Sequence, residues 1–263
     1  MKKIIIFGMM SFAILIFVSV FFLMYKNNIF GMEVHPRING TMQLIVVPYF
    51  PPTDPAWDVI YDQAKEYPGT IKYVIINPCS GPCGTTLSQD WEDVISKLKE
   101  RGVKSLGYVF NTSENFSNID YYMKNPSVTT DGIFFDNEGS TDDLTNFKQY
   151  ADYVHHLGGI VYINPGYNYT YVDTYVLSGV SDVANIYELG YVGSQQIGAN
   201  RAIPHWENSV IVGNVTNPQQ LKSELTEIAN KGIGISYLYG DSYDTLPPYF
   251  SKEVEIAAST KVQ

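Results

Sequence analysis

The sequence predicts a (β/α)8 barrel, the TIM-barrel fold, preceded by one N-terminal transmembrane helix. Eight apolar, β-rich runs begin about 22 to 31 residues apart, and segments with helical apolar spacing lie between most of them. Several of the runs, such as Leu-Ile-Val-Val at 44–47 and Gly-Ile-Phe-Phe at 132–135, are almost continuously apolar. Continuous apolar strands indicate burial on both faces, as a parallel sheet covered by helices requires.

Each of the eight units can be placed along the chain. The strand-like runs begin near Gln43, Lys72, Val103, Asp131, Gly159, Ser181, Ser209 and Gly232. Helical spacing is clearest in residues 57–66, 89–101, 142–157 and 218–231. The sixth unit is the weakest, because residues 192–203 are rich in Gly and Gln, and we interpret this segment as an active-site loop.

An open, doubly wound sheet is the alternative architecture. No Gly-x-Gly-x-x-Gly turn follows any of the strands and no phosphate-binding loop is present, so the barrel is favoured. Residues 42–263 are therefore predicted to form one domain, with residues 27–41 as a linker.

Residues 1–26 have the pattern of a membrane anchor. Residues 4–24 carry no charge, a length that spans a bilayer, and no Ala-x-Ala cleavage pattern follows them. Lys2 and Lys3 outweigh Lys26, which keeps the N-terminus in the cytoplasm and places the barrel outside it. If the segment is instead a cleaved signal, the protein is secreted.

The domain is acidic. Without Lys2, Lys3, Lys26, Arg37 and Glu33, the chain retains 13 basic and 26 acidic residues. This balance argues against a nucleic-acid partner. The acidic surface either keeps an exported domain soluble or attracts a cationic polymer.

The two cysteines are separated by a Ser-Gly-Pro turn, at Cys79 and Cys83. A disulfide that staples this loop is expected outside the cell. The alternative is a metal pair, but zinc takes four ligands and the four histidines are scattered along the sequence. We expect neither a metal nor a cofactor.

Carboxyl groups close two of the predicted strands. Asp136 and Glu138 follow the apolar run that begins at Asp131, and Glu188 closes the run that begins at Ser181. In a barrel, catalytic groups lie at the carboxyl ends of the strands. Two acids at this end suit glycoside cleavage, in which one donates a proton to the leaving oxygen and the other attacks or stabilises the anomeric carbon.

Amides and aromatic residues dominate the other strand ends. Carboxamides bind sugar hydroxyls and aromatic rings bind the CH faces of sugars, so this composition suits a carbohydrate site. Asn and Pro also form turns, which is the alternative role for each amide. The candidate substrate-binding residues are Tyr49, Asn77, Asn137, Asn164, Tyr187, Tyr239 and Asp241.

Six motifs recur at the predicted strands and strand ends. They are Val-Pro-Tyr-Phe-Pro-Pro at 47–52, Ile-Asn-Pro-x-Ser-Gly-Pro at 76–82, Gly-Tyr-Val at 107–109, the Asp131 to Asp136 strand, Asn-Pro-Gly at 164–166 and Glu188. Together these motifs resemble the spherulin-4 (spherulation-specific) family, to which fungal glycoside hydrolases of family 135 belong. The resemblance implies a (β/α)8 fold. For the fungal relatives it implies endo-cleavage of α-1,4-linked N-acetylgalactosamine polymers such as galactosaminogalactan.

One position departs from the family pattern. The resemblance implies an Asp-Glu pair at the end of strand four and a Glu at the end of strand six, which correspond to Asp136, position 137 and Glu188. Position 137 is Asn. Glu138 can fill the missing role if the strand end is shifted by one residue, whereas an unshifted strand directs it elsewhere. Asn137 can instead orient an acetamido group of the substrate.

The leading hypothesis is a membrane-anchored glycoside hydrolase that acts on an amino-sugar polysaccharide outside the cell. Glu188 and Glu138 then share the acid and the base or nucleophile roles, and Asp136 tunes them. The alternatives are a non-catalytic polysaccharide-binding protein on the same fold and a structural domain of the cell envelope.

Overall fold

The computed structural model describes residues 39–110, 115–138, 144–166, 170–190, 202–215 and 217–263. The predicted anchor, most of the linker and most of the Gly- and Gln-rich segment lie outside these residues, so the anchor stays a prediction. Within the described residues, no helix is long and apolar enough to cross a membrane.

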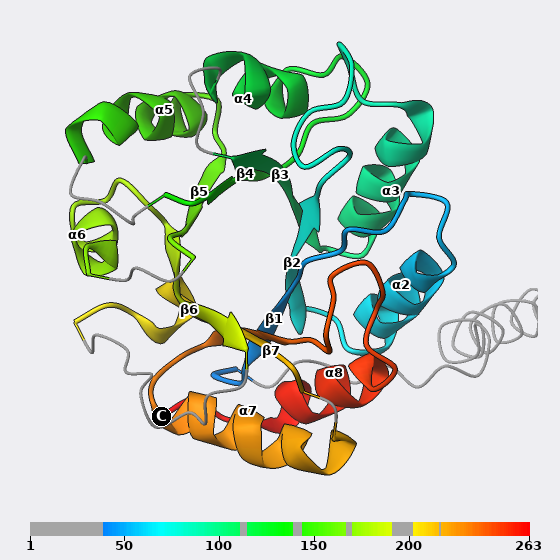
Figure 1. Ribbon diagram of the computed structural model, residues 1–263. Coiled ribbons are helices and arrows are strands. Elements are labelled where there is room, and N and C mark those ends of the chain that lie inside the picture. Colours follow the sequence, from blue (N-terminus) through cyan, green and yellow to red (C-terminus); the bar gives the residue numbers. More distant parts are fainter. Residues whose placement is uncertain (1–38, 111–114, 139–143, 167–169, 191–201, 216) are drawn as a thin grey trace, which may run out of the picture. The chain divides into compact units, whose positions relative to one another are not determined.

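Eight parallel strands form one closed barrel in sequence order, which confirms the predicted TIM barrel (Figure 1). The strands are β1 (Gln43–Val46), β2 (Ile71–Ile76), β3 (Lys104–Phe110), β4 (Gly132–Asp136), β5 (Ile160–Asn164), β6 (Val183–Gly190), β7 (Asn208–Gly213) and β8 (Ile235–Leu238).

Helices surround the ring of strands on the outside (Figure 1). They are α2 (Ala56–Glu66), α3 (Gln89–Glu100), α4 (Asn115–Met123), α5 (Leu144–His156), α6 (Val172–Leu177), α7 (Leu221–Asn230) and α8 (Phe250–Ser259), with the 3-10 turns η2 (His205–Glu207) and η3 (Pro218–Gln220). The four predicted helical segments correspond to α2, α3, α5 and α7. The sequence pattern did not indicate α4, α6 or α8.

Alternate residues of each strand face the interior or the helices. Phe134 of β4 contacts the interior rings of Tyr108 and Tyr162, with ring centroids 6.1 and 5.1 Å apart. The next residue, Phe135, packs against Phe147 of α5 at 5.0 Å. This alternation determines which strand-end side chains enter the mouth, the carboxyl-terminal end of the barrel.

The barrel closes between β8 and β1 through a short seam. The two strands pair only at Gln43 with Ile235 and at Leu44 with Ser236. Beyond this pairing, the backbone N–H of Leu238 donates a hydrogen bond of 2.8 Å to Oε1 of Glu253, a fully buried residue of α8. A side chain thus replaces the missing backbone partner, because a buried N–H without an acceptor is unfavourable.

Candidate active site

Asp136 ends β4 with its carboxylate in the mouth. Oδ2 accepts a hydrogen bond from the hydroxyl of Tyr108, the interior residue of β3. Oδ1 accepts hydrogen bonds from Nδ2 of Asn164 at 2.8 Å and from the backbone N–H of Asn137 at 3.1 Å. Three donors therefore hold this carboxylate in one orientation.

Glu188 reaches the mouth because β6 contains a bulge. Asn185 of β6 pairs with Ser209 of β7 and Glu188 pairs with Ile211, so three steps along β6 match two along β7. In a regular strand Tyr187 would share the face of Asn185 and Glu188 would point toward the helices. The extra residue turns Glu188 inward, and Tyr187 lies at the bulge with its ring buried.

One amide joins the two acids. Nδ2 of Asn164, at the end of β5, donates to Oδ1 of Asp136 at 2.8 Å and also to Oε2 of Glu188. Two oxygens that share one amide nitrogen lie only a few ångströms apart. Asp136 and Glu188 therefore form a close pair across β5 (candidate catalytic pair).

The orientation of the Asn164 amide is set from the barrel interior. Its Oδ1 accepts a hydrogen bond of 2.9 Å from Nδ2 of Asn185, and Oδ1 of Asn185 lies 3.4 Å from the hydroxyl of Ser209. The hydroxyl of Tyr162 in turn donates to Ser209. Because Asn185 donates to the oxygen of Asn164, the NH2 group of Asn164 must face the acids.

Replacing Asn185 with leucine is expected to reduce activity, because Oδ1 of Asn164 would lose the shorter of its two hydrogen bonds and keep only that from the backbone N–H of Gly166 at 3.3 Å. Mispositioning of this kind costs about 10–100-fold in rate. The measurement is turnover of Asn185→Leu and of Asn185→Asp on the substrate polymer, with melting curves to confirm folding. Unchanged turnover in both variants would mean that Asn164 is oriented without Asn185.

Burial raises the pKa of Glu188 above its usual value. Hydrogen bonds from Tyr243 and Asn164 lower this pKa, and the nearby charge of Asp136 raises it again. Burial dominates, so Glu188 retains its proton at a higher pH than an ordinary glutamate does. Of the pair, Glu188 is thus suited to donate a proton.

Tyrosines from the loops after β1 and β8 line the same end of the barrel. The hydroxyl of Tyr243 donates to Oε1 of Glu188 at 2.7 Å. The ring of Tyr243 stacks on Tyr239 with centroids 4.2 Å apart and also contacts Tyr49 at 5.2 Å. A Cβ atom at Gly213 would lie 2.5 Å from the Tyr239 ring, so glycine on β7 makes room for this stack. Burial raises the pKa of Tyr49 to about 12, so its hydroxyl stays protonated.

The structure does not bring Glu138 to the catalytic pair. The expectation that an unshifted strand directs Glu138 elsewhere was wrong, because alternation along β4 would turn it to the same side as Asp136. Asn137 takes a left-handed conformation, with φ of 62°, and ends the strand before that. Oε1 of Glu138 instead accepts a hydrogen bond of 2.9 Å from Tyr175 of α6, which packs against Phe147 of α5. Glu138 thus lies in the layer between strands and helices, while Asn137 is exposed beside Asp136.

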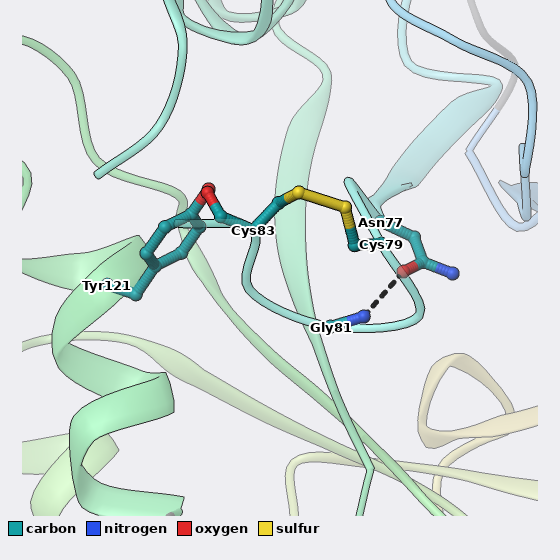
Figure 2. Close-up of a disulfide and its surroundings, with 5 residues drawn as sticks. All are labelled: Asn77, Cys79, Gly81, Cys83 and Tyr121. Atoms are coloured by element: carbon teal, nitrogen blue, oxygen red, sulfur yellow. Dashed lines mark hydrogen bonds between the residues drawn. A yellow bond between two sulfur atoms is a disulfide. The ribbon is translucent and has the colours of Figure 1, made fainter. Parts of the chain in front are cut away.

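Asn77 organises the cysteine loop (Figure 2). Its Oδ1 accepts a hydrogen bond of 2.8 Å from the backbone N–H of Gly81, and the predicted disulfide between Cys79 and Cys83 is confirmed. The hydroxyl of Tyr121 on α4 donates to the carbonyl of Cys83 at 3.0 Å, which ties the loop to that helix. The hydrogen bond between Asn77 and Gly81 supports the turn-forming role for Asn77.

The sequence of the chain matches the model of one protein family. The model described as spherulation-specific family 4 (Spherulin4) matches residues 43–257, which include every strand of the barrel. The chain belongs to the spherulation-specific family 4. Comparison of this Spherulin4 protein with curated protein sequences found no match.

Several solved structures share this fold with TM-scores above 0.5. A GH18 chitinase from Pseudoalteromonas aurantia has a TM-score of 0.55 at 11% identity, over 82% of this chain and 99% of the chitinase. An endo-β-N-acetylglucosaminidase from Cordyceps militaris has 0.52 at 9%, over 83% and 90%. The α-L-fucosidase isoenzyme 2 from Paenibacillus thiaminolyticus has 0.54 at 11%, over 83% and 49%. At these identities the similarity establishes the fold.

The remaining candidate of this Spherulin4 protein, Asp241, is exposed in the loop after β8. Within the described residues, no group of three His, Cys, Asp or Glu side chains could hold a metal ion.

Sequence reasoning did not single out Tyr108, Asn185 or Tyr243 as site residues. A signal existed for Asn185, since a lone amide inside an apolar strand needs a hydrogen-bonding partner. Nothing local marks Tyr243, which reaches Glu188 from 55 residues away in the sequence.

Proposed function

We propose that this Spherulin4 protein is a glycoside hydrolase that cleaves an amino-sugar polysaccharide containing N-acetylgalactosamine or galactosamine. The observation that carries the proposal is the amide of Asn164 shared by Asp136 and Glu188, because glycoside cleavage requires two carboxyl groups close to one glycosidic bond. The names of the three structural neighbours, all of glycan-cleaving enzymes, are consistent with it.

The two acids have different roles in this proposal. Glu188, with its raised pKa, donates a proton to the leaving oxygen as the glycosidic bond breaks. Asp136, held as an acceptor by three donors, attacks the anomeric carbon and forms a glycosyl-enzyme ester as the leaving sugar departs with that proton. A water molecule that gives its proton to Glu188 then cleaves this ester and frees Asp136. Glu138, the other sequence candidate, contacts Tyr175 and has no part in this step.

The test is incubation of the purified protein with galactosaminogalactan and, separately, with other amino-sugar polymers, followed by measurement of released reducing ends. New reducing ends that increase with time and with enzyme concentration support a hydrolase. Polymer that stays intact under all these conditions contradicts it.

The reaction is expected to retain the anomeric configuration. An inverting pair leaves about 6.5–9.5 Å between carboxyl groups for a water molecule, whereas a retaining pair is separated by about 5–5.5 Å. Asp136 and Glu188 both accept a hydrogen bond from Nδ2 of Asn164, and this closeness favours the separation of a retaining pair. Proton NMR of the first product formed from an α-linked oligomer should show the α-anomer, and an initial β-anomer would contradict this assignment.

A second candidate is a polysaccharide-binding protein without turnover. It is favoured by Asn137, which replaces a carboxyl group of the family pattern while Glu138 is directed away from the mouth. It predicts saccharide binding that survives Glu188→Gln and no product from any polymer.

We also propose that residues 1–26 anchor the barrel at the outer face of the membrane. The uncharged run at 4–24, the preceding lysines and the disulfide support this location. Digestion of the barrel by protease added to intact cells tests it, and full protection would contradict it.

A further inference from the structure

Phe110 lies at the rim of the mouth beside the catalytic pair. It ends β3 and pairs in register with Asp136 of β4. Gly107 of the same strand faces the helices, because a Cβ atom there would lie 2.2 Å from the ring of Tyr122 on α4. Tyr108 faces the interior, and alternation therefore places Phe110 on the interior face, one layer closer to solvent.

Tyr108 and Phe110, which share the interior face of β3, differ sharply in solvent exposure. Tyr108 is 5% exposed, whereas Phe110 is 46% exposed. Two residues along a strand correspond to about 6–7 Å, so the ring of Phe110 lies about that far above Tyr108 toward the solvent. A large apolar ring thus stands open to solvent next to Asp136.

Among the described residues, the two tyrosines that donate to the pair are already engaged. Tyr108 donates its hydroxyl to Asp136 and Tyr243 donates to Glu188, and both rings pack against Tyr49. These tyrosines hold the acids in place. Phe110 has no hydroxyl to contribute, so its available property is the apolar face of its ring.

An apolar ring face beside a carboxylate matches the surface of a pyranose, which carries C–H groups on one face and hydroxyls around its edge. We propose that Phe110 is a substrate-positioning residue, whose ring stacks on the apolar face of the sugar unit next to Asp136. This inference rests on the proposed function and deepens it, because it places one sugar-binding subsite on the β3 side of the pair.

Binding measured without turnover tests the inference. In the Glu188→Gln background, titration calorimetry would measure affinity for a tetramer of α-1,4-linked N-acetylgalactosamine and, separately, for chitotetraose. Phe110→Ala and Phe110→Leu are both expected to weaken binding about tenfold, while Phe110→Trp retains it. Loss in the leucine variant distinguishes stacking on a ring from simple apolar contact.

Trp206 supplies the matched control. It is 50% exposed in η2, which directly precedes β7 and so lies at the amino-terminal end of the barrel, opposite the acids. Trp206→Ala should leave the affinity unchanged. With active enzyme, Phe110→Ala should raise KM more than it lowers kcat, as expected for a residue that binds substrate in the ground state.

The possible failures are distinguishable. A tetramer that binds Glu188→Gln equally well with and without Phe110→Ala overturns the role of Phe110 and leaves the proposed function intact. A parent protein that neither binds nor cleaves any of these saccharides overturns both. Equal weakening by Phe110→Ala and Trp206→Ala also overturns the inference, because the effect is then not specific to the mouth. Melting curves of each variant confirm that the fold is retained.

Discussion

Replacing Glu188 with glutamine is expected to lower the rate of polymer cleavage by about 10²–10⁴-fold, the range that a general acid contributes. Glutamine has the same size and can still accept from Asn164 and donate to the hydroxyl of Tyr243, so the local hydrogen bonds persist. It has no proton to give at neutral pH. The variant should therefore fold normally, with a melting temperature equal to or above that of the parent, because a buried titrating group is removed.

Glu138→Gln is the matched comparison for this experiment. Both are glutamates at strand ends, but Glu138 binds Tyr175 in the layer beneath the helices. Its replacement should leave most of the turnover. If Glu138→Gln abolishes cleavage and Glu188→Gln does not, the assignment of the acid is reversed. The raised pKa of Glu188 also predicts that cleavage persists at pH values where an ordinary glutamate is ionised, and that it declines once Glu188 loses its proton.

The stability of the protein is expected to fall as the pH rises toward 8, because of Glu253. Complete burial raises its pKa from 4.5 to about 8. Its Oε1 accepts the Leu238 N–H, and its Oε2 has no hydrogen-bond partner among the described residues. No second donor therefore compensates for ionising this carboxyl group.

The sign of this pH dependence follows from the protons bound to Glu253 in the folded and unfolded states. Between about pH 4.5 and 8 the folded protein keeps a proton on Glu253 that the unfolded chain has released, so stability decreases with rising pH. Each pH unit lowers the free energy of unfolding by about 1.4 kcal/mol, on the order of 5 kcal/mol in total. Below pH 4.5 this contribution is complete, and above about pH 8 no further loss occurs.

Denaturant unfolding of wild type and Glu253→Gln from pH 4 to 9 checks this prediction. The glutamine retains an acceptor for the Leu238 N–H and does not titrate. The free energy of unfolding of the variant should therefore decrease less between pH 4 and 9 than that of wild type. The slope with pH is the measurement, because the substitution itself shifts absolute stability. Glu255→Gln, at an exposed position of the same helix, should follow wild type. Parallel curves for Glu253→Gln and wild type would contradict the raised pKa.

Much of the barrel was predictable from local patterns. Continuous apolar runs become strands when both faces are buried, and this requirement is visible in the sequence. Helices α2, α3, α5 and α7 carry apolar residues at helical spacing over at least ten residues. Helix α6 has only six residues, too few for a periodic pattern to be distinguished.

The strand-end acids were also predictable, but their directions were not. Asp136 follows the alternation of β4, whereas Glu188 enters the mouth only because of the bulge before it. The left-handed conformation of Asn137 directs Glu138 away from the mouth, and the amino-acid sequence does not reveal that conformation. In both cases one backbone residue decides which side of the barrel wall a carboxyl group occupies.

The sequence by itself determined the barrel, its family motifs, the disulfide and the presence of acids and amides at the carboxyl ends of strands. These properties depend on composition and on local periodicity. Only the tertiary structure decided that Asp136 and Glu188 share the amide of Asn164, that Tyr108 and Tyr243 hold them, and that Phe110 stands open beside them. The physical reason is that the closure and register of the barrel set which distant side chains meet, and no local pattern encodes those contacts.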